Sequence, residues 1–128
     1  PELKVGVIPP IAAITYQKMI GKHGAYEMLF TGKEYKAAQA ARIGLITKAV
    51  VEEKLDIEVN RVIKKITASS TIILKMLKQA MTRTAEMNFE DSLKEVERIY
   101  TKSLIKTSDL REGLNAFLEK RKPLWKNK

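Results

Sequence analysis

Apolar residues recur every three or four positions through the second half of this chain, and that spacing restricts the folds open to it. The repeat runs through residues 59–66, 73–81, 89–104 and 110–118. At this period the apolar side chains fall on one face of a helix, whereas a strand would alternate at every second residue. Asn88 and Ser108 precede the last two series, where a helix N-cap is expected. The sequence therefore predicts helices throughout this half.

The first half is predicted to hold shorter helices and the only strand candidates. Helices are expected over residues 11–20, 25–30 and 36–43, ended by Gly21, by Thr31-Gly32 and by Gly44 in a left-handed cap. The stretch LKVGVI (3–8) is predicted as a short strand that Pro9-Pro10 ends. Residues 49–51 are predicted as a second short strand or an extended link. We therefore expect a mostly α chain with one or two short strands.

Composition excludes some classes of protein and leaves others open. The 128 residues suffice for a single domain with its own core, and no cysteine is present for disulfides or thiolate metal sites. No run approaches the roughly 18 consecutive apolar residues of a membrane span. The net charge of +9 predicts attraction to an anion. Nucleic acid, an anionic membrane and a phosphorylated cofactor all satisfy that requirement.

Few side chains in the sequence are candidates for catalysis, metal binding or ligand binding. The one histidine, His23, is predicted in a loop with no cysteine or second histidine to share a metal ion, so no metal site is expected. Ser69-Ser70-Thr71 is predicted as a helix N-cap rather than a nucleophile. Glu2 is either a general acid or base with a raised pKa or a solvated residue. Two interpretations of the basic residues around Trp125 remain open. Either they bind a phosphate while a base stacks on the indole ring, or they form a solvated helix end.

Several short motifs together resemble one enzyme family. They are PELKVGVIPP at the start, LFTG at 29–32, Ala-X-X-Ala-X-X-X-Gly-Leu-Ile at 37–46, and REG followed by FLEKRK between 111 and 122. In this order the chain resembles the carboxy-terminal half of the enoyl-CoA hydratase/isomerase (crotonase) family over essentially its whole length. The resemblance implies a single segment from the helical part of the α/β crotonase fold. Its expected parts are the last strand and turn of the spiral core (1–9), helices with a connecting strand (10–70), and a helical oligomerisation and CoA-clamping region (71–128).

The resemblance also implies an activity and its residues. Members act on acyl-CoA thioesters, and hydration of a 2-enoyl-CoA is expected, through oxyanion stabilisation and glutamate acid/base chemistry with no further cofactor. Glu2 matches the family's second catalytic glutamate. Lys120 matches a lysine that reaches the CoA 3′-phosphate or pyrophosphate, and Phe117 a residue packing near the adenine. An upstream half would supply the other carboxylate and one oxyanion amide, so the chain is expected to be a fragment that is inactive alone.

The expected partners and location follow from the same resemblance. They are an acyl-CoA substrate and further copies of the chain in a trimer or hexamer, with no nucleic acid and no membrane. We expect a cytoplasmic enzyme of fatty acid metabolism.

One departure from the family pattern leaves the type of reaction open. Hydratases generally have Gly-Ala-Gly-Gly after the strand, and the amide of the first glycine helps to hold the catalytic water. This chain has Pro10-Ile11-Ala12-Ala13 there, and proline has no N–H. An isomerase, decarboxylase or hydrolase is therefore the alternative. A basic helical nucleic-acid-binding module is a remote alternative, because the lysines are spread among acidic residues, as in DSLKEVER.

Overall fold

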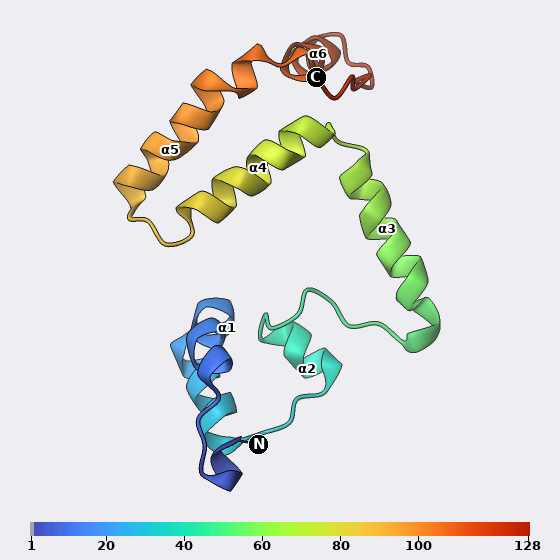
Figure 1. Ribbon diagram of the computed structural model, residues 1–128. Coiled ribbons are helices and arrows are strands. Elements are labelled where there is room, and N and C mark those ends of the chain that lie inside the picture. The colour runs from blue at the N-terminus through green and yellow to red at the C-terminus, as the bar shows by residue number, and fades with distance from the viewer. Residues whose placement is uncertain (1) are drawn as a thin grey trace. The chain divides into compact units, whose positions relative to one another are not determined.

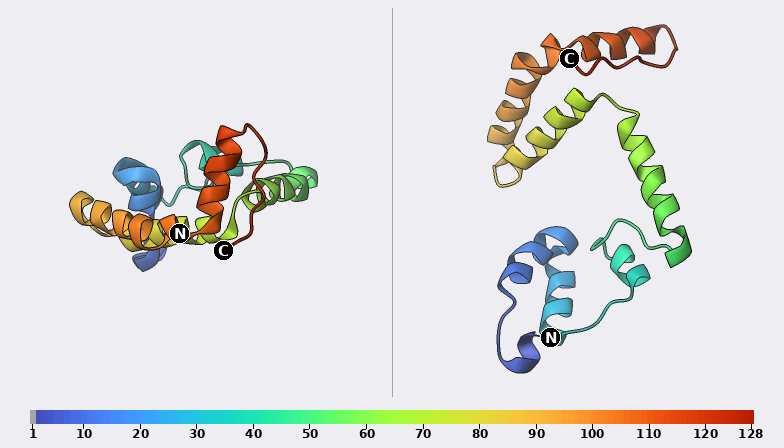
Figure 2. Two further views of the ribbon diagram at one scale, coloured as in Figure 1. Left: turned by 90° about the horizontal axis from the view of Figure 1, so that it is seen from above. Right: turned by 45° about the vertical axis from the view of Figure 1, so that its right-hand side comes forward.

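The computed structural model describes residues 2–128 as helices joined by short loops (Figure 1; Figure 2). In chain order the elements are η1 (Glu2–Val5), α1 (Pro10–Thr31), α2 (Ala37–Arg42), η2 (Glu52–Lys54), α3 (Leu55–Thr67), α4 (Thr71–Thr84), α5 (Phe89–Lys102), η3 (Leu104–Lys106) and α6 (Ser108–Leu118), where η denotes a 3-10 helix. No strand occurs in this described range. The mostly α prediction is confirmed, and the strand at residues 3–8 is not formed.

The contacts within the chain divide it into two compact units. The first ends at Glu58, and the second comprises Val59–Lys128. Pro1, which belongs to the segment expected over residues 1–9, lies outside the described residues. No described helix combines the length and apolarity that crossing a lipid bilayer requires.

The predicted strand at residues 3–8 is wrong because these residues bond locally. Glu2–Val5 form η1, after which the Gly6 amide donates to the Leu3 carbonyl at 3.2 Å and the Val7 amide to the Glu2 carbonyl at 3.1 Å. Gly6 has a φ of 79°, in the left-handed region that glycine enters without steric cost. A strand needs a neighbouring strand to pair its amides and carbonyls. The described residues supply no such neighbour.

α1 consists of two helical arms that meet at a kink at Gly21. It begins at Pro10, where a proline fits because the first-turn amides have no partner inside the helix. The break predicted at Gly21 is present, since this residue has non-helical φ and ψ of 74° and 164°. Gly32 ends the helix with a φ of 59°, as predicted. His23 lies exposed in the second arm of α1 rather than in the expected loop.

The loop that follows α2 contains the second predicted strand segment. α2 (Ala37–Arg42) ends just before Gly44, whose φ of 80° confirms the predicted left-handed cap. Residues 49–51 form an extended link without strand pairing, which was the second of the two alternatives. Val51 has φ and ψ of −67° and 151°. Its β-branched side chain favours extended backbone, but extension alone does not make a sheet.

In the second unit, α4 and α5 pack side by side as a hairpin (Figure 1; Figure 2). The side-chain oxygens of Ser70 and Asn88 each accept an amide from the first turn of their helix, at 3.4 and 3.0 Å. Both N-cap predictions are confirmed. The apolar residues facing the seam are Ile73, Met76, Leu77, Ala80, Val96, Ile99, Tyr100 and Leu104. They leave a pocket of about 220 Å³, so the seam is only partly filled.

A carboxylate joins the two helices of this hairpin. Glu95 on α5 accepts hydrogen bonds from Arg83 of α4 at 2.7 Å and from Arg98 at 2.8 Å, and its side chain is 17% exposed. The hydrogen bond from Arg98, followed by that from Arg83, lowers the pKa of the Glu95 carboxyl to about 2. The ionised form is therefore the one that stabilises the fold.

Glu95→Gln is expected to reduce the stability of the protein at neutral pH. Because the folded-state pKa is depressed, the contribution of the carboxylate is complete above its ordinary value of 4.5 and is lost as the pH falls toward about 2. The difference in urea midpoint between parent and variant should therefore shrink over that range. Glu97→Gln, an exposed position on the same helix, is the control and should leave the midpoint unchanged at every pH. A constant difference down to about pH 2 would contradict the assignment.

The last helix, α6, is capped by a different residue from the one predicted. Thr107 Oγ1 accepts the Leu110 amide at 3.1 Å, so Thr107 is the N-cap and Ser108 is the first helical residue. The Ser108 hydroxyl instead donates to the carbonyl of Lys128 at 2.9 Å. The end of the chain therefore returns to the start of α6.

The described residues bury few apolar side chains. The buried ones are Ala25, Met28, Ala40, Ile99 and Ala116. Many larger ones stay open to solvent, including Val5 (77% exposed), Ile8 (74%) and Ile11 (75%) around the start of α1. Burial of apolar area is the main favourable term in folding, and much of this chain's apolar surface is left uncovered by its own contacts.

Candidate functional site

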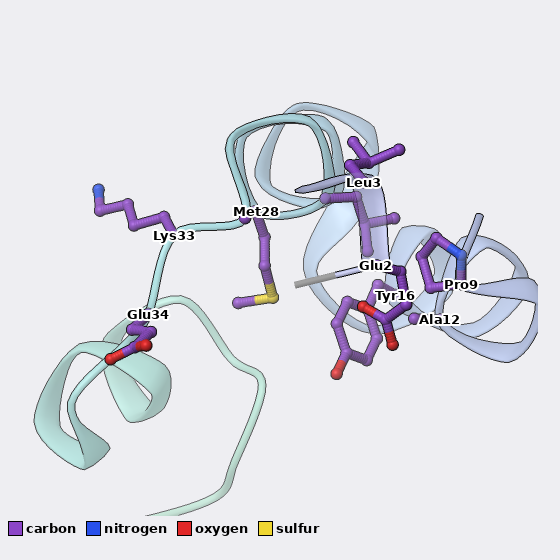
Figure 3. Close-up of a pocket in the computed structure, with 10 residues that line it drawn as sticks. Glu2, Leu3, Pro9, Ala12, Tyr16, Met28, Lys33 and Glu34 are labelled. Atoms are coloured by element: carbon purple, nitrogen blue, oxygen red, sulfur yellow. The ribbon is translucent and has the colours of Figure 1, made fainter. Parts of the chain in front are cut away.

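Glu2 borders a pocket in the first unit (Figure 3). The pocket measures about 240 Å³ and lies between η1 and α1. Its lining residues are Glu2, Leu3, Pro9, Ala12, Tyr16, Met28, Leu29, Gly32, Lys33 and Glu34. Figure 3 shows the Glu2 carboxylate beside Tyr16, Pro9 and Ala12. The pocket is thus lined mainly by apolar residues, with the carboxylates of Glu2 and Glu34 and the Lys33 ammonium among its polar groups.

The Glu2 carboxyl is held in its ionised form. Its side chain is exposed, and a hydrogen bond from its own backbone amide is the largest cause of a lowered pKa. The raised pKa is therefore not found, and Glu2 is an exposed, ionised carboxylate at neutral pH. Ionisation is the state that a general base requires, although a lowered pKa makes the carboxylate a weaker base.

A second pocket, which Glu2 also lines, lies at the first turn of α1. It measures about 310 Å³ and is lined by Glu2, Pro9, Pro10, Ile11, Ala12, Thr15 and Tyr16. Helix starts carry amides without partners inside the helix. Ala13 already donates to the Pro9 carbonyl at 2.9 Å, and Pro10 has no N–H. The amides of Ile11 and Ala12 are therefore the first-turn donors at this pocket.

Phe117 and Lys120 meet in one turn at the end of α6. The Lys120 amide donates to the Phe117 carbonyl at 3.2 Å, and the Arg121 amide donates to the Ala116 carbonyl at 3.0 Å. This pair of bonds is the Schellman motif, which ends a helix with one residue in the left-handed conformation. Lys120 is that residue, with a φ of 52°. Phe117 is 81% exposed and Lys120 is also exposed, so both side chains face solvent.

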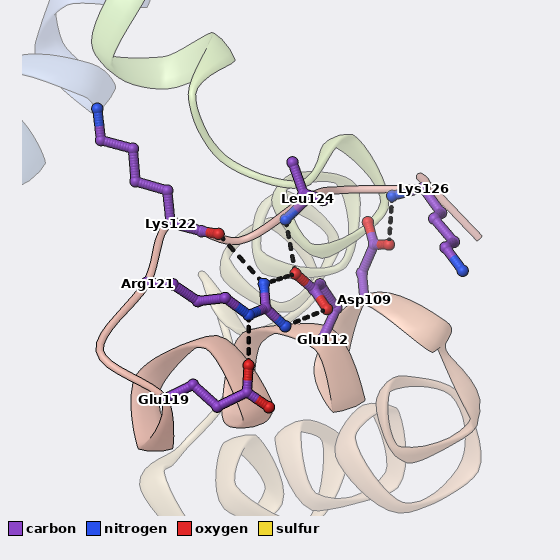
Figure 4. A network of polar contacts seen from close by, with 7 residues as sticks. All are labelled: Asp109, Glu112, Glu119, Arg121, Lys122, Leu124 and Lys126. Carbon is purple, nitrogen blue, oxygen red and sulfur yellow. Dashed lines mark hydrogen bonds and ion pairs between the residues drawn. The ribbon is translucent and has the colours of Figure 1, made fainter.

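Residues 121–128 form a tail that Glu112 of α6 holds through hydrogen bonds and an ion pair (Figure 4). Its carboxylate receives the Arg121 guanidinium through two bonds, at 2.6 and 3.1 Å, and the Leu124 amide at 2.7 Å. Arg121 also pairs with Glu119 at 2.5 Å. The Arg121 hydrogen bond is the main cause that lowers the pKa of the Glu112 carboxyl to about 2. Such charge-assisted, two-pronged pairs fix orientation as well as adding energy.

A buried aspartate anchors the far end of the same tail. Asp109 is fully buried, and its two oxygens accept the amides of Lys126 at 2.7 Å and Asn127 at 2.9 Å. Burial opposes its ionisation, but hydrogen bonds from Ser70 and from these amides outweigh that effect and lower its pKa. The Asn127 side-chain oxygen in turn accepts the Thr71 amide at 2.8 Å. The tail is therefore an ordered part of the second unit.

The interpretation of Trp125 as an open platform for a base is wrong. Its indole N–H donates to the Ala68 carbonyl at 2.7 Å, and its ring lies against Gly113, where an added Cβ would be 3.4 Å from the indole. The side chain is half-buried. Trp125 therefore packs the tail against the rest of the unit.

Sequence reasoning missed Asp109 and Glu112 as individual residues. They stand three positions apart, and on a helix such residues share a face. Two carboxylates on one face, followed nine residues after Glu112 by an arginine, were the available signal. The motif Arg111-Glu112-Gly113 contributes to the family resemblance, which assigns no role to Glu112.

The sequence-predicted site residues fall into two groups. Phe117 and Lys120 lie in one turn of the second unit, and Glu2 belongs to the first unit. Within residues 2–128 no group of three His, Cys, Asp or Glu residues is arranged to hold a metal ion.

A family model described as enoyl-CoA hydratase/isomerase matches residues 1–128. A probable mitochondrial enoyl-CoA hydratase of Dictyostelium discoideum is 35% identical over 129 residues, covering 100% of this chain and 46% of that protein. A probable enoyl-CoA hydratase of Rhizobium meliloti is 33% identical, covering 100% and 50%. The chain thus spans about half the length of the curated relatives it matches.

Solved structures agree with this similarity. An enoyl-CoA hydratase from Bacillus anthracis superposes with a TM-score of 0.89 at 27% identity, over 99% of this chain and 49% of that one. An enoyl-CoA hydratase from Mycobacterium smegmatis gives a TM-score of 0.88 at 28% identity, over 96% and 48%. In both cases the similarity is to about half of the solved chain.

Proposed function

The chain belongs to the enoyl-CoA hydratase/isomerase family, and from that membership we propose that it supplies the carboxy-terminal half of an enzyme acting on an acyl-CoA thioester. The observation that carries the proposal is the position of Glu2, an ionised carboxylate at the edge of a mainly apolar pocket. An acyl chain needs apolar walls, and its activation needs a group that moves a proton. The reaction proposed first is hydration of a 2-enoyl-CoA.

The proposed hydration gives Glu2 the role of proton carrier. The oxygen of water bonds to the β-carbon while one of its protons passes to a carboxylate. The electrons of the double bond move onto the thioester oxygen, which becomes an enolate held by backbone amides. A proton then returns to the α-carbon, and the net change is addition of one water. The upstream half would supply a second carboxylate and one of the oxyanion amides.

Pro10 supports a second candidate reaction. It lacks the amide that would hold the attacking water, although the neighbouring Ile11 and Ala12 amides border the same pocket. An isomerase needs no such water, because a proton leaves one carbon and returns to another. A decarboxylase or hydrolase is the further alternative. Product analysis of the full-length parent with a 2-enoyl-CoA and a 3-enoyl-CoA distinguishes hydration from isomerisation.

We further propose that Lys120 and Phe117 hold the nucleotide end of coenzyme A. Lys120 offers an exposed cation for the 3′-phosphate or pyrophosphate, and Phe117 offers an exposed ring for the adenine. The net charge of +9 favours such a polyanionic ligand. No cofactor beyond the coenzyme A of the substrate is proposed.

Lys120→Glu in the full-length parent is expected to weaken coenzyme A binding by about tenfold or more, because a charge-assisted contact is replaced by repulsion. Binding of 3′-dephospho-coenzyme A should weaken much less. Isothermal titration calorimetry with both ligands measures the two effects. Lys106→Glu, a charge reversal outside the α6 turn, is the matched control. Equal losses for both ligands would show that Lys120 does not meet the 3′-phosphate.

The proposed assembly is a homo-oligomer, a trimer or hexamer, in the cytoplasm. Exposed apolar residues of α4 and α5 outside their seam, such as Met81, Phe89 and Leu93, support self-association, since uncovered apolar area of this kind favours contact with another chain. The name of the Dictyostelium relative places that protein in mitochondria. Microscopy of the tagged full-length parent tests the compartment directly.

A further inference from the structure

Lys120 occupies a position that favours glycine. It is the left-handed residue of the Schellman motif at the end of α6, with a φ of 52°. Residues with a Cβ enter this region at a steric cost, and lysine has no short polar side chain to offset it. Strained conformations of this kind persist where neighbouring contacts hold them, and they occur often at functional sites.

The contacts that hold this turn come from the next residue. Arg121 donates its amide to the Ala116 carbonyl and its guanidinium to Glu112 and Glu119. Glu112 also accepts the Leu124 amide at 2.7 Å. The backbone that follows Lys120 is therefore held by two sets of contacts. The Arg121 amide bonds to α6, and the tail bonds to Glu112 (Figure 4). Lys120 itself stays exposed.

The charge at the turn is arranged so that Lys120 remains available. Both carboxylates near the turn, Glu112 and Glu119, are occupied by Arg121. Among the described residues of the second unit, no ion pair joins Lys120 to a carboxylate. Arg121 therefore neutralises the acidic groups that would otherwise compete for the lysine.

We propose that Glu112 is a positioning residue that acts through Arg121, fixing the left-handed turn so that Lys120 presents its ammonium to a phosphate of the ligand. This inference deepens the proposed function and rests on it, because the ligand is taken to be coenzyme A. The binding contact is made by Lys120, whereas Glu112 holds Arg121 beside the turn, and Arg121 occupies both nearby carboxylates.

The first test concerns the strain at Lys120 in the full-length parent. Lys120→Gly should raise the thermal midpoint by about 2–4 °C, because glycine removes the cost of the left-handed conformation. The same variant should lose the preference for coenzyme A over its 3′-dephospho form. A lower midpoint would overturn the assignment of strain. An unchanged ligand preference would overturn the proposed phosphate contact itself.

The second test separates positioning from simple stabilisation. Glu112→Gln should reduce the preference for coenzyme A over 3′-dephospho-coenzyme A by about three- to tenfold, measured as the ratio of the two Kd values by calorimetry. Combined with Lys120→Ala, it should reduce that preference no further than Lys120→Ala alone, since both act on one contact. Glu95→Gln is the matched control. Glu95 binds the side chains of Arg83 and Arg98, whereas Glu112 binds Arg121 and the Leu124 amide. The two carboxylates are similarly exposed, at 17% and 19%, and both have a pKa of about 2.

The outcomes distinguish the two proposals. If Lys120→Ala abolishes the preference while Glu112→Gln weakens the binding of both ligands equally, the contacts of Glu112 only stabilise the fold and the inference fails. Additive losses in the double variant, or an equal loss of preference in Glu95→Gln, would also overturn it. If Lys120→Ala leaves the preference intact, the proposed coenzyme A contact fails first, and the role of Glu112 fails with it.

Discussion

Glu2→Gln in the full-length parent is expected to lower kcat by about 10²–10⁴-fold, the range typical of losing a general acid or base. The amide keeps the size and hydrogen-bonding reach of the side chain but cannot carry a proton at neutral pH. Because Glu2 borders the pocket without belonging to the Lys120 turn, coenzyme A affinity should stay close to that of the parent. Steady-state hydration or isomerisation assays, together with calorimetry of coenzyme A, measure the two quantities.

The choice of control matters because Glu2 is exposed and ionised. Glu34→Gln is suitable, since Glu34 borders the same pocket and its side chain points away from Glu2 in Figure 3. Its kcat should change little. If Glu2→Gln retains the activity of the parent, or if Glu34→Gln is equally damaging, Glu2 does not carry the substrate proton.

The helices were predictable because their signals are local. Apolar spacing and the caps at Ser70, Asn88 and Gly44 lie within a few residues of the elements that they define. The cap of α6 was misassigned by one residue, because Thr107 and Ser108 both carry a hydroxyl and only the folded chain sends one of them to Lys128. Local patterns identify an element more reliably than its terminal residue.

The strand at residues 3–8 was not predictable from its own composition. Its apolar residues suit a strand, but pairing depends on a neighbour that these residues do not contain. With no partner among the described residues, the glycine at position 6 permits a left-handed turn and η1 forms instead. Strand formation is decided by distant residues, whereas a capped helix is decided by nearby ones.

The candidate site also contains residues whose contacts are decided by distant parts of the chain. Glu2, Phe117 and Lys120 were singled out through the family resemblance, because a lone carboxylate and an exposed lysine carry little signal by themselves. Asp109 and Glu112 act on amides 12 to 18 residues away, at Leu124, Lys126 and Asn127. Contacts between residues so far apart in sequence depend on how the tail folds, and helical periodicity does not predict that fold.

This chain alone is expected to turn over crotonyl-CoA at least about 10²–10³-fold more slowly than its full-length parent. The proposed active site is composite, with Glu2 on this chain and one oxyanion amide, the second carboxylate and most of the acyl pocket on the upstream half. Loss of one oxyanion donor by itself typically costs about that factor. The chain spans only about half the length of its relatives, so the proposal assigns those contributions to residues outside it.

The same chain should also self-associate. Val5, Ile8, Ile11 and Phe30 are each at least 69% exposed in the first unit, and apolar surface on that scale favours association. Sedimentation velocity over a range of concentrations measures the oligomers, and parallel assays of chain and parent measure the turnover. Adding the separately purified upstream half is the informative control, because a composite site should regain activity when both halves are present. A monomeric chain that hydrates crotonyl-CoA at the rate of the parent would show that the catalytic groups all lie within these 128 residues, and the proposed division of the site would then be wrong.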